Sequence, residues 1–137
     1  MQALQLLETY SKTTRDIEIT ISPEYLAEQS DPAEGVFSYS YTVNMRNGGS
    51  DAVQLINRHW IVLSGGVQIA DVKGEGVVGE QPVLEPGEDY SYTSWTTVVN
   101  PVGSMSGSYT FYSESGEFFD VEVPQFELLY VDQNSVY

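Results

Sequence analysis

Three groups of residues in this sequence have types and spacings that could do chemistry. Gly74, Gly76 and Gly79 form the pattern G-x-G-x-x-G, which in dinucleotide-binding folds lets a helix N-terminus approach a pyrophosphate. His59 follows Arg58 and is the single histidine, so a catalytic or metal-binding imidazole would have to be this one. Carboxylates are dense in the turns that follow: Glu75, Glu80, Glu85, Glu88 and Asp89.

The glycine pattern fits nucleotide chemistry only where a strand precedes it and a helix follows it. Residues 80–87 contain two prolines and a glycine, so a helix cannot follow here. Glu75 and Glu80 would also repel a phosphate. We therefore interpret residues 74–79 first as a structural turn or bulged strand, and keep anion binding by loop N–H groups and Rossmann-type binding as alternatives.

His59 has no partner in any familiar catalytic or metal motif. Hydrolysis by a serine triad would need a nucleophile elbow of the form G-x-S-x-G, and neither this pattern nor the spacing H-x-x-x-H occurs. We interpret His59 as a framework histidine hydrogen-bonded within a sheet, and Trp60 as a core residue. A carboxylate pair for glycoside hydrolysis and a loosely hydrated Mg²⁺ site remain alternatives for the acidic turns.

Composition limits the partners and the compartment. The chain of 137 residues has no cysteine, which excludes disulfides, thiolate metal sites and a cysteine nucleophile. A net charge of −15 disfavours nucleic acid and favours cations or basic protein surfaces, although it also suits a plain acidic surface. No signal peptide and no apolar run of roughly 20 residues are present, so we expect a cytoplasmic protein with no membrane partner.

The elements that must position these residues are strands. Alternation of apolar and polar residues, separated by glycine- and proline-containing turns, predicts about seven or eight short antiparallel strands. The clearest segments are 17–21, 37–46, 53–63, 67–72, 89–98, 106–112 and 117–123. We predict an all-β sandwich of the immunoglobulin or fibronectin type III kind. The helix candidates are residues 2–10 and 23–28, and residues 131–137 read as a frayed polar tail.

The segment 53–63 does not fit this scheme, because apolar residues occupy both of its faces. A bulge near residues 57–59 would shift the alternation. Alternatively, the N-terminal segment 4–10 or a second copy of the chain would cover the outer face.

Fixed spacings along the chain resemble one family. They are Arg58-His59-Trp60, Gly74-x-Gly76-Val77-Val78-Gly79-x-Gln81-Pro82, Leu84-x-Pro86-Gly87, Tyr92-x-Ser94, Pro101-x-Gly103-x-Met105-x-Gly107-x-Tyr109, Gly116-x-x-Phe119-Asp120-Val121 and Val123-Pro124-Gln125-Phe126. Together they are similar to the ApaG (CorD) family over about residues 14–128. The chain departs from the family pattern at Trp95, where members usually carry Gly or Cys, and at Asn100, where members carry Thr.

The resemblance implies a fibronectin type III-like domain at 14–128, with an N-terminal extension (1–13) and a C-terminal tail (129–137). Family members stand alone in bacteria, where they are associated with cobalt and magnesium resistance or efflux and with diadenosine tetraphosphate hydrolase. In eukaryotes they are fused to modules such as an F-box. No catalytic residues are established for the family.

We therefore expect a non-enzymatic binding module that recognises a protein partner. A homodimer is kept as an alternative. The alternative is a sensor that binds a divalent cation or a nucleotide through residues 74–79. The candidate ligand-binding residues are Gly74, Gly76, Gly79, Arg58 and His59. No cofactor is expected, with Mg²⁺ or Co²⁺ as the alternative, and no metal ligand is assigned.

Overall fold

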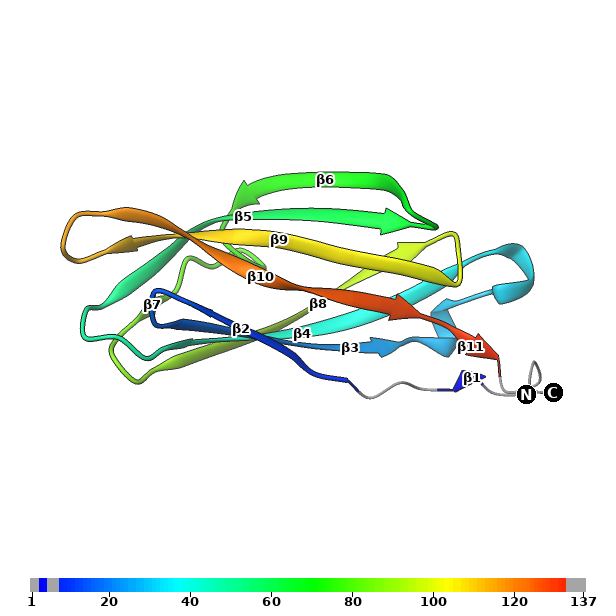
Figure 1. Cartoon of the computed structure of the whole chain (residues 1–137), viewed down its shortest axis with the longest axis horizontal. Coiled ribbons are helices and arrows are strands. Elements are labelled where there is room, and N and C mark those ends of the chain that lie inside the picture. The colour runs from blue at the N-terminus through cyan, green and yellow to red at the C-terminus, as the bar shows by residue number, and fades with distance from the viewer. Residues whose placement is uncertain (1–2, 5–7, 133–137) are drawn as a thin grey trace.

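Two antiparallel sheets packed face to face make up this protein, seen in a computed structural model that describes residues 3–4 and 8–132 (Figure 1). The four-stranded sheet has the order β2-β3-β4-β8, and the other sheet has the order β10-β9-β5-β6, with β7 paired to β5. A short pair, β1 with β11, lies beside them. The predicted all-β sandwich is confirmed.

The elements have the following bounds. The first sheet contains β2 (Tyr10–Thr14), β3 (Ile17–Tyr25), β4 (Phe37–Asn47) and β8 (Asp89–Val98). The second contains β5 (Val53–Ser64), β6 (Val67–Glu75), β7 (Val83–Leu84), β9 (Val102–Ser113) and β10 (Phe118–Leu129). The short elements are β1 (Ala3–Leu4), β11 (Val131–Asp132) and two 3₁₀ turns, η1 (Ala27–Gln29) and η2 (Pro32–Glu34).

All seven predicted strands are present, and the predicted helices are wrong. Pro23 belongs to β3, at a point where β2 has ended and β3 is the edge of its sheet, a position that tolerates proline. Only the 3₁₀ turn η1 follows it. The N-terminal helix candidate, residues 2–10, contains β1 and the start of β2, and its residues 2 and 5–7 lie outside the described part. Residues 131–132 of the predicted tail form β11.

Strand β2 crosses the predicted domain boundary at residue 14. Its sequence Tyr-Ser-Lys-Thr-Thr lacks the alternation that predicts a strand. The turn that follows β2 positions it for pairing with β3. Arg15 and Asp16 have φ of 48° and 68°, the positive values of a tight hairpin turn that matches the strand twist. The hairpin therefore brings Tyr10–Thr14 alongside β3.

A bulge in β5 explains why regular alternation places apolar residues on both faces of the segment 53–63. The register of β5 against β9 shifts between Leu55 and Asn57, so Ile56 is the extra residue. Val53 and Leu55 before the bulge, and Trp60 and Val62 after it, are all buried between the sheets. Trp60 is 5% exposed, which confirms the core prediction. In the described residues the N-terminal segment does not cover β5, because Tyr10 packs against Phe126 of β10.

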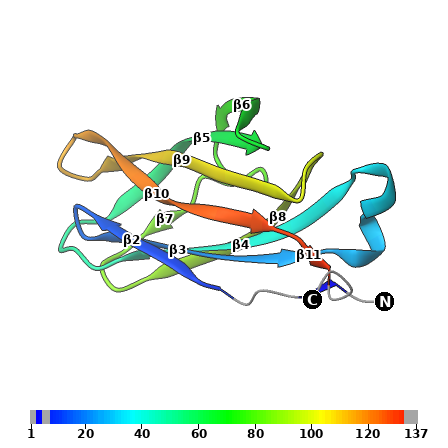
Figure 2. The same ribbon diagram turned by 45° about the vertical axis from the view of Figure 1, so that its right-hand side comes forward.

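The sandwich is closed along one side and open along the other. On the closed side β10 packs directly against β2 and β3, and Tyr41 and Trp60 both pack on Phe126. On the open side β6 and β8 lack comparable contact, and β6 stands away from the opposite sheet in Figure 2. Val72 is 45% exposed although its partner in the ladder is the buried Trp60. The opening therefore leaves inward-facing apolar surface in contact with solvent.

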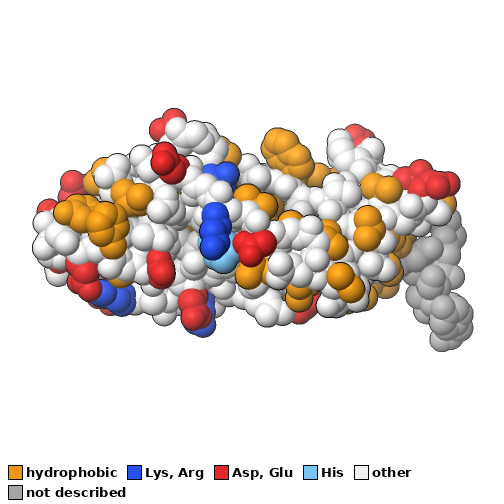
Figure 3. All heavy atoms as spheres, turned by 90° about the horizontal axis from the view of Figure 1, so that it is seen from above, with side chains coloured by type: hydrophobic (Ala, Val, Ile, Leu, Met, Phe, Trp, Pro, Cys, Tyr) orange, Lys and Arg blue, Asp and Glu red, His pale blue; other side chains and the backbone are white. Residues whose placement is uncertain are grey.

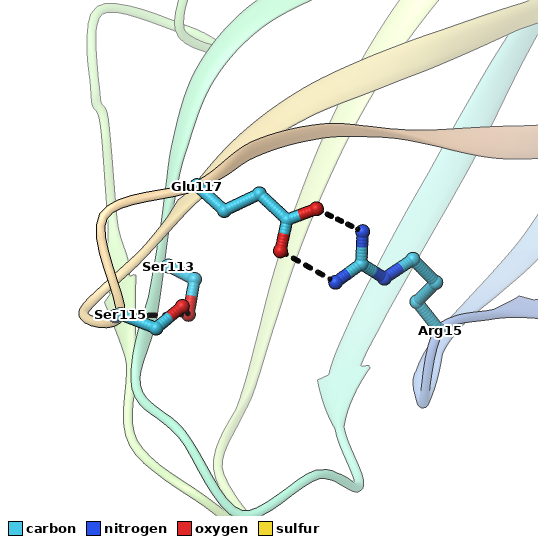
Figure 4. Close-up of polar contacts among 4 residues, drawn as sticks. All are labelled: Arg15, Ser113, Ser115 and Glu117. Atoms are coloured by element: carbon cyan, nitrogen blue, oxygen red, sulfur yellow. Dashed lines mark hydrogen bonds and ion pairs between the residues drawn. The ribbon is translucent and has the colours of Figure 1, made fainter.

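A bidentate ion pair joins the two sheets at one end of the molecule. Arg15 in the β2–β3 turn donates from both Nη atoms to Glu117 beside the β9–β10 turn, at 2.8 and 2.9 Å (Figure 4). The same guanidinium lies 4.6 Å from the centre of the Phe119 ring. In the turn between β9 and β10, Ser115 contacts Ser113. Because both charged side chains are about half exposed, solvent screens the pair.

The buried Tyr39 hydroxyl and the buried Asn47 side chain should differ in their contribution to the free energy of unfolding. Among the described residues the Tyr39 hydroxyl is the one buried side-chain polar atom without a hydrogen-bond partner, and Tyr39 is 2% exposed. Tyr39→Phe should therefore leave the free energy of unfolding unchanged or raise it by about 1 kcal/mol. Asn47→Ala should lower it by about 2 kcal/mol or more, because the buried Asn47 side chain bonds Asp51, Leu84 and Gly49. Urea denaturation of both variants measures this, and a clear loss in Tyr39→Phe would contradict it.

Candidate functional site

A cleft of about 380 Å³ lies between the sheets on the open side of the sandwich. Its walls are mainly apolar and come from both sheets, with Trp60 and Met105 at the buried side. Three exposed apolar residues surround its mouth: Val72 on β6, Val78 after β6, and Trp95 on β8. Its volume and apolar lining are typical of a small-ligand pocket.

Arg58 brings a positive charge into this cleft. The bulge at Ile56 turns Arg58 to the same side of β5 as Trp60, toward the space between the sheets. Its Nη1 donates to the carbonyl oxygens of Glu75 (3.0 Å) and Gly76 (2.8 Å). These two bonds hold the guanidinium at one end of the cleft.

Gly74 leaves the room that the guanidinium occupies. Gly74 is the ladder partner of Arg58, and a Cβ at this position would lie 2.9 Å from Nη2 and 3.0 Å from Cζ. The absence of a side chain on β6 thus allows the guanidinium to lie against the strand. Two of the predicted site residues, Arg58 and Gly74, are therefore in direct contact.

Carboxylates do not neutralise this charge. Within residues 3–4 and 8–132 the ion pairs are Lys12–Glu122, Arg15–Glu117 and His59–Asp71, and Arg58 takes part in none of them. The hydrogen bonds that its guanidinium makes to described residues leave from Nη1 and end on neutral carbonyls. The cleft thus presents an unneutralised cation beside apolar walls, an arrangement that favours an anion.

Tyrosine hydroxyls lie near the guanidinium. Tyr92 lines the cleft, and its hydroxyl is 2.5 Å from the hydroxyl of the fully buried Tyr109. Burial raises the pKa of Tyr41, Tyr92 and Tyr109, and the charge of Arg58 offsets this only in part. These phenols are therefore neutral at ordinary pH. If Tyr109 donates to Tyr92, the Tyr92 hydroxyl keeps its own proton to donate into the cleft.

The loop at 76–80 uses much of its own backbone hydrogen-bonding capacity. Gly76 N donates to Ile56 O, while Val77 and Glu80 exchange N–H···O bonds of 2.8 Å. Gly76, Val78 and Gly79 all have positive φ. The loop is thus a tight turn that holds the Val77 side chain in the core, where it is 1% exposed. A phosphate would find three of its N–H groups already paired.

His59 lies on the opposite face of β5, away from the cleft. Its Nε2 is 2.7 Å from Asp71 Oδ1, and its side chain is 31% exposed. It borders a depression of about 430 Å³ on the outer face, together with Lys73, Ser108 and Asp120. Figure 3 shows this face, with the histidine near its middle between basic and acidic side chains. Since no described hydroxyl bonds the His59 ring, the geometry offers no activated nucleophile.

Neither a metal site nor a membrane helix is found in the described residues. They contain no group of three or more His, Asp or Glu side chains placed to hold an ion. Two of the turn carboxylates bond within the protein: Glu88 accepts from Glu85 N, and Asp89 accepts from the Asn44 side chain. No helix in the described part is long and apolar enough to span a bilayer.

Comparisons with known proteins identify the family. The ApaG domain profile matches residues 27–113. The chain belongs to the ApaG family. Protein ApaG of Paramagnetospirillum magneticum is 49% identical over 119 residues, covering 87% of this chain and 92% of the relative. Protein ApaG of Bradyrhizobium sp. strain ORS 278 is 50% identical, with the same coverage. The family resemblance inferred from the sequence is therefore confirmed.

Two solved structures have the same fold. A crystal structure of a Bordetella pertussis protein assigned as ApaA matches with a TM-score of 0.81 and 41% identity, covering 83% of this chain and 93% of that one. An X-ray structure of a structural-genomics target matches with a TM-score of 0.78 and 36% identity, covering 89% and 91%. Both structures thus share the fold of this chain over most of its length.

The structure brings some of the candidate residues together and separates others. Of the candidates chosen from the sequence, Gly74 and Gly76 contact Arg58, which lines the cleft, whereas Gly79 makes no such contact and His59 lies on the opposite face. Tyr41, Tyr92 and Ser94 of the other sheet could not be connected with Arg58 from the sequence, because only the packing of the sheets brings these residues together. The one available signal was Tyr92-x-Ser94, which places two residues on one face of β8.

The glycines of the loop should differ sharply in their tolerance of a side chain. At Gly76, with φ of 63°, an added Cβ would lie 2.3 Å from Glu80 O. Gly76→Ala should therefore lower the free energy of unfolding by about 3 kcal/mol or more, from strain and clash together. Gly79, with φ of 82°, has no atom within 4 Å of that position, so Gly79→Ala should cost about 1 kcal/mol. Equal losses in urea denaturation would argue against this account of the loop.

Because its buried tyrosines have raised pKa values, we expect the protein to lose stability in alkali. Their folded-state pKa lies above the ordinary value of 10.0, so their stabilising effect is fully present below that pH. Above it, tyrosines of the unfolded chain lose protons that the folded chain keeps. Each pH unit should then lower the free energy of unfolding by about 1.4 kcal/mol per buried tyrosine. Circular dichroism and phenolate absorbance should change together, and Tyr109→Phe should show a smaller slope.

Proposed function

We propose that this ApaG-family chain is a non-enzymatic binding domain that recognises a partner protein along the open side of its sandwich. The observation that carries this proposal is the group of exposed apolar side chains at the cleft mouth. Trp95 is 73% exposed, Val78 61% and Val72 45%. Aromatic and apolar residues gathered around a concavity are typical of the anchor region of a protein interface.

Two free strand edges flank this mouth. Strand β6 pairs on one side with β5, and β8 pairs on one side with β4, so each has an edge without a strand partner among the described elements. An edge strand with free N–H and C=O groups can accept an added strand from a partner. The side chains at the mouth would then supply the apolar anchor, and the free edge would supply backbone hydrogen bonds.

The charge of the chain indicates the kind of partner. Twenty acidic against five basic residues give a field that attracts a basic surface. We therefore expect a partner with a basic rim around an apolar contact, binding more weakly as salt rises. The predicted homodimer would bring two acidic surfaces together, which makes a second copy the less favourable occupant. We also propose that the chain is cytoplasmic and that it has a role in cobalt or magnesium resistance.

Binding through residues 74–79 stays a prediction, and no contact in the structure favours it. The three paired N–H groups of that loop reduce what it can offer a pyrophosphate. The loop instead supports Arg58 through the carbonyls of Glu75 and Gly76. Its contribution to binding would then be indirect.

A pair of exposed aromatic residues tests the proposal. Trp95→Ala removes the largest side chain at the mouth, whereas Phe118→Ala removes one that is 63% exposed on β10, outside the cleft lining. With the immobilised full chain, quantitative capture from native cytosol at increasing salt should show partner proteins that Trp95→Ala loses by about tenfold or more and Phe118→Ala retains. If both variants capture the same proteins as the parent chain, the open side is not the interface. Sedimentation velocity of the purified chain tests the homodimer separately.

A further inference from the structure

We propose that the cleft is also a small-molecule site, which binds a carboxylate carried on an apolar body. This inference goes beyond the proposed protein interaction and does not depend on it. The carboxylate would meet Arg58 and the hydroxyl of Tyr92, and the apolar body would lie along Trp60, Val62 and Met105 toward the mouth.

The electrostatics of the cleft select the anion. The Arg58 guanidinium makes two hydrogen bonds to neutral carbonyls, and the ion pairs of the described chain leave it without a carboxylate. A half-buried guanidinium is most favourable opposite a planar carboxylate, which it can meet with two parallel donors. With Tyr109 donating to Tyr92, the neutral Tyr92 phenol has an O–H donor left for the same carboxylate. Among residues 3–4 and 8–132 no side chain pairs with Arg58 as a carboxylate, so we infer that a ligand supplies it.

The surroundings limit the size and charge of the ligand. A volume of about 380 Å³ accommodates a molecule of modest size, and most of its wall is apolar. A polyphosphate would be repelled by the net charge of −15, whereas a single negative charge can be matched by Arg58. The chemical class that fits is a monocarboxylic acid with an aromatic or aliphatic body.

The bonding of Arg58 gives the site its shape before any ligand arrives. Gly74 leaves the guanidinium room, and the carbonyls of Glu75 and Gly76 fix its direction. A positioned cation loses little freedom when it binds, which favours affinity. The glycine-rich segment would therefore serve anion binding by holding an arginine, without using its own N–H groups.

Paired probes test the proposal in the intact protein. Phenylbutyrate and octanoate would be titrated against phenylbutyramide and octanamide, which have the same bodies without the charge. Both tryptophans of the chain line the cleft, so tryptophan fluorescence reports binding. At least one acid should bind about tenfold or more tightly than its amide. If no acid binds at millimolar concentration, or if acids and amides bind equally, the proposal is overturned.

Matched variants locate the charge that is responsible. Arg58→Gln keeps an amide donor for the loop carbonyls and removes the charge, so it should abolish the preference for acid over amide. Lys73→Gln removes a charge from the same region on the outer face of the sheet and should retain the preference. A preference that survives in Arg58→Gln would overturn the assignment. Should that variant not fold, Tyr92→Phe replaces it, and unchanged acid binding there would count against the site. Because no partner protein is involved, this outcome is independent of the Trp95 experiment.

Discussion

The bulge at Ile56 in β5 decides which side chains meet between the two sheets. If β5 alternated regularly, with no bulge to absorb Ile56, Trp60 and Val62 would lie on the face opposite Leu55, and the core would lose its central aromatic ring. With it, both halves of β5 contribute to one core. The same shift turns Arg58 inward, so the core and the candidate site depend on one local irregularity. The site is thus a consequence of how the core is assembled.

The difference between the two sides of the sandwich gives that inward arginine its access to solvent. Strand β10 packs on β2 and β3 and closes one side. There the Phe126 ring contacts the rings of Tyr10, Tyr41 and Trp60. Strand β6 extends beyond the opposite sheet, so its inner face is left without a covering layer (Figure 2). Exposed apolar surface along such an edge costs free energy, and surface of this kind is typical of interaction sites.

The glycine-rich segment has a structural role that differs from its resemblance to a nucleotide motif. Gly74 makes room for a guanidinium, Gly76 allows a close approach to Glu80, and Gly79 completes the turn with positive φ. In a dinucleotide-binding fold the same residue types would present N–H groups to a phosphate, but there a helix follows. Here a short turn and β7 follow, and the backbone donors pair within the protein.

The sequence alone determined the sandwich, because period-two alternation and turn residues are local signals that any strand with one buried face must carry. It identified the ApaG spacings, the buried Trp60 and the framework bond of His59 within the sheet. It could not determine that His59 and Arg58 lie on opposite faces of β5 or that Tyr92 faces Arg58, because these depend on one bulge and on the packing of strands distant in the chain. Whether a charged side chain lies in solvent or beside a cleft is a property of that packing, and only the tertiary structure decided it.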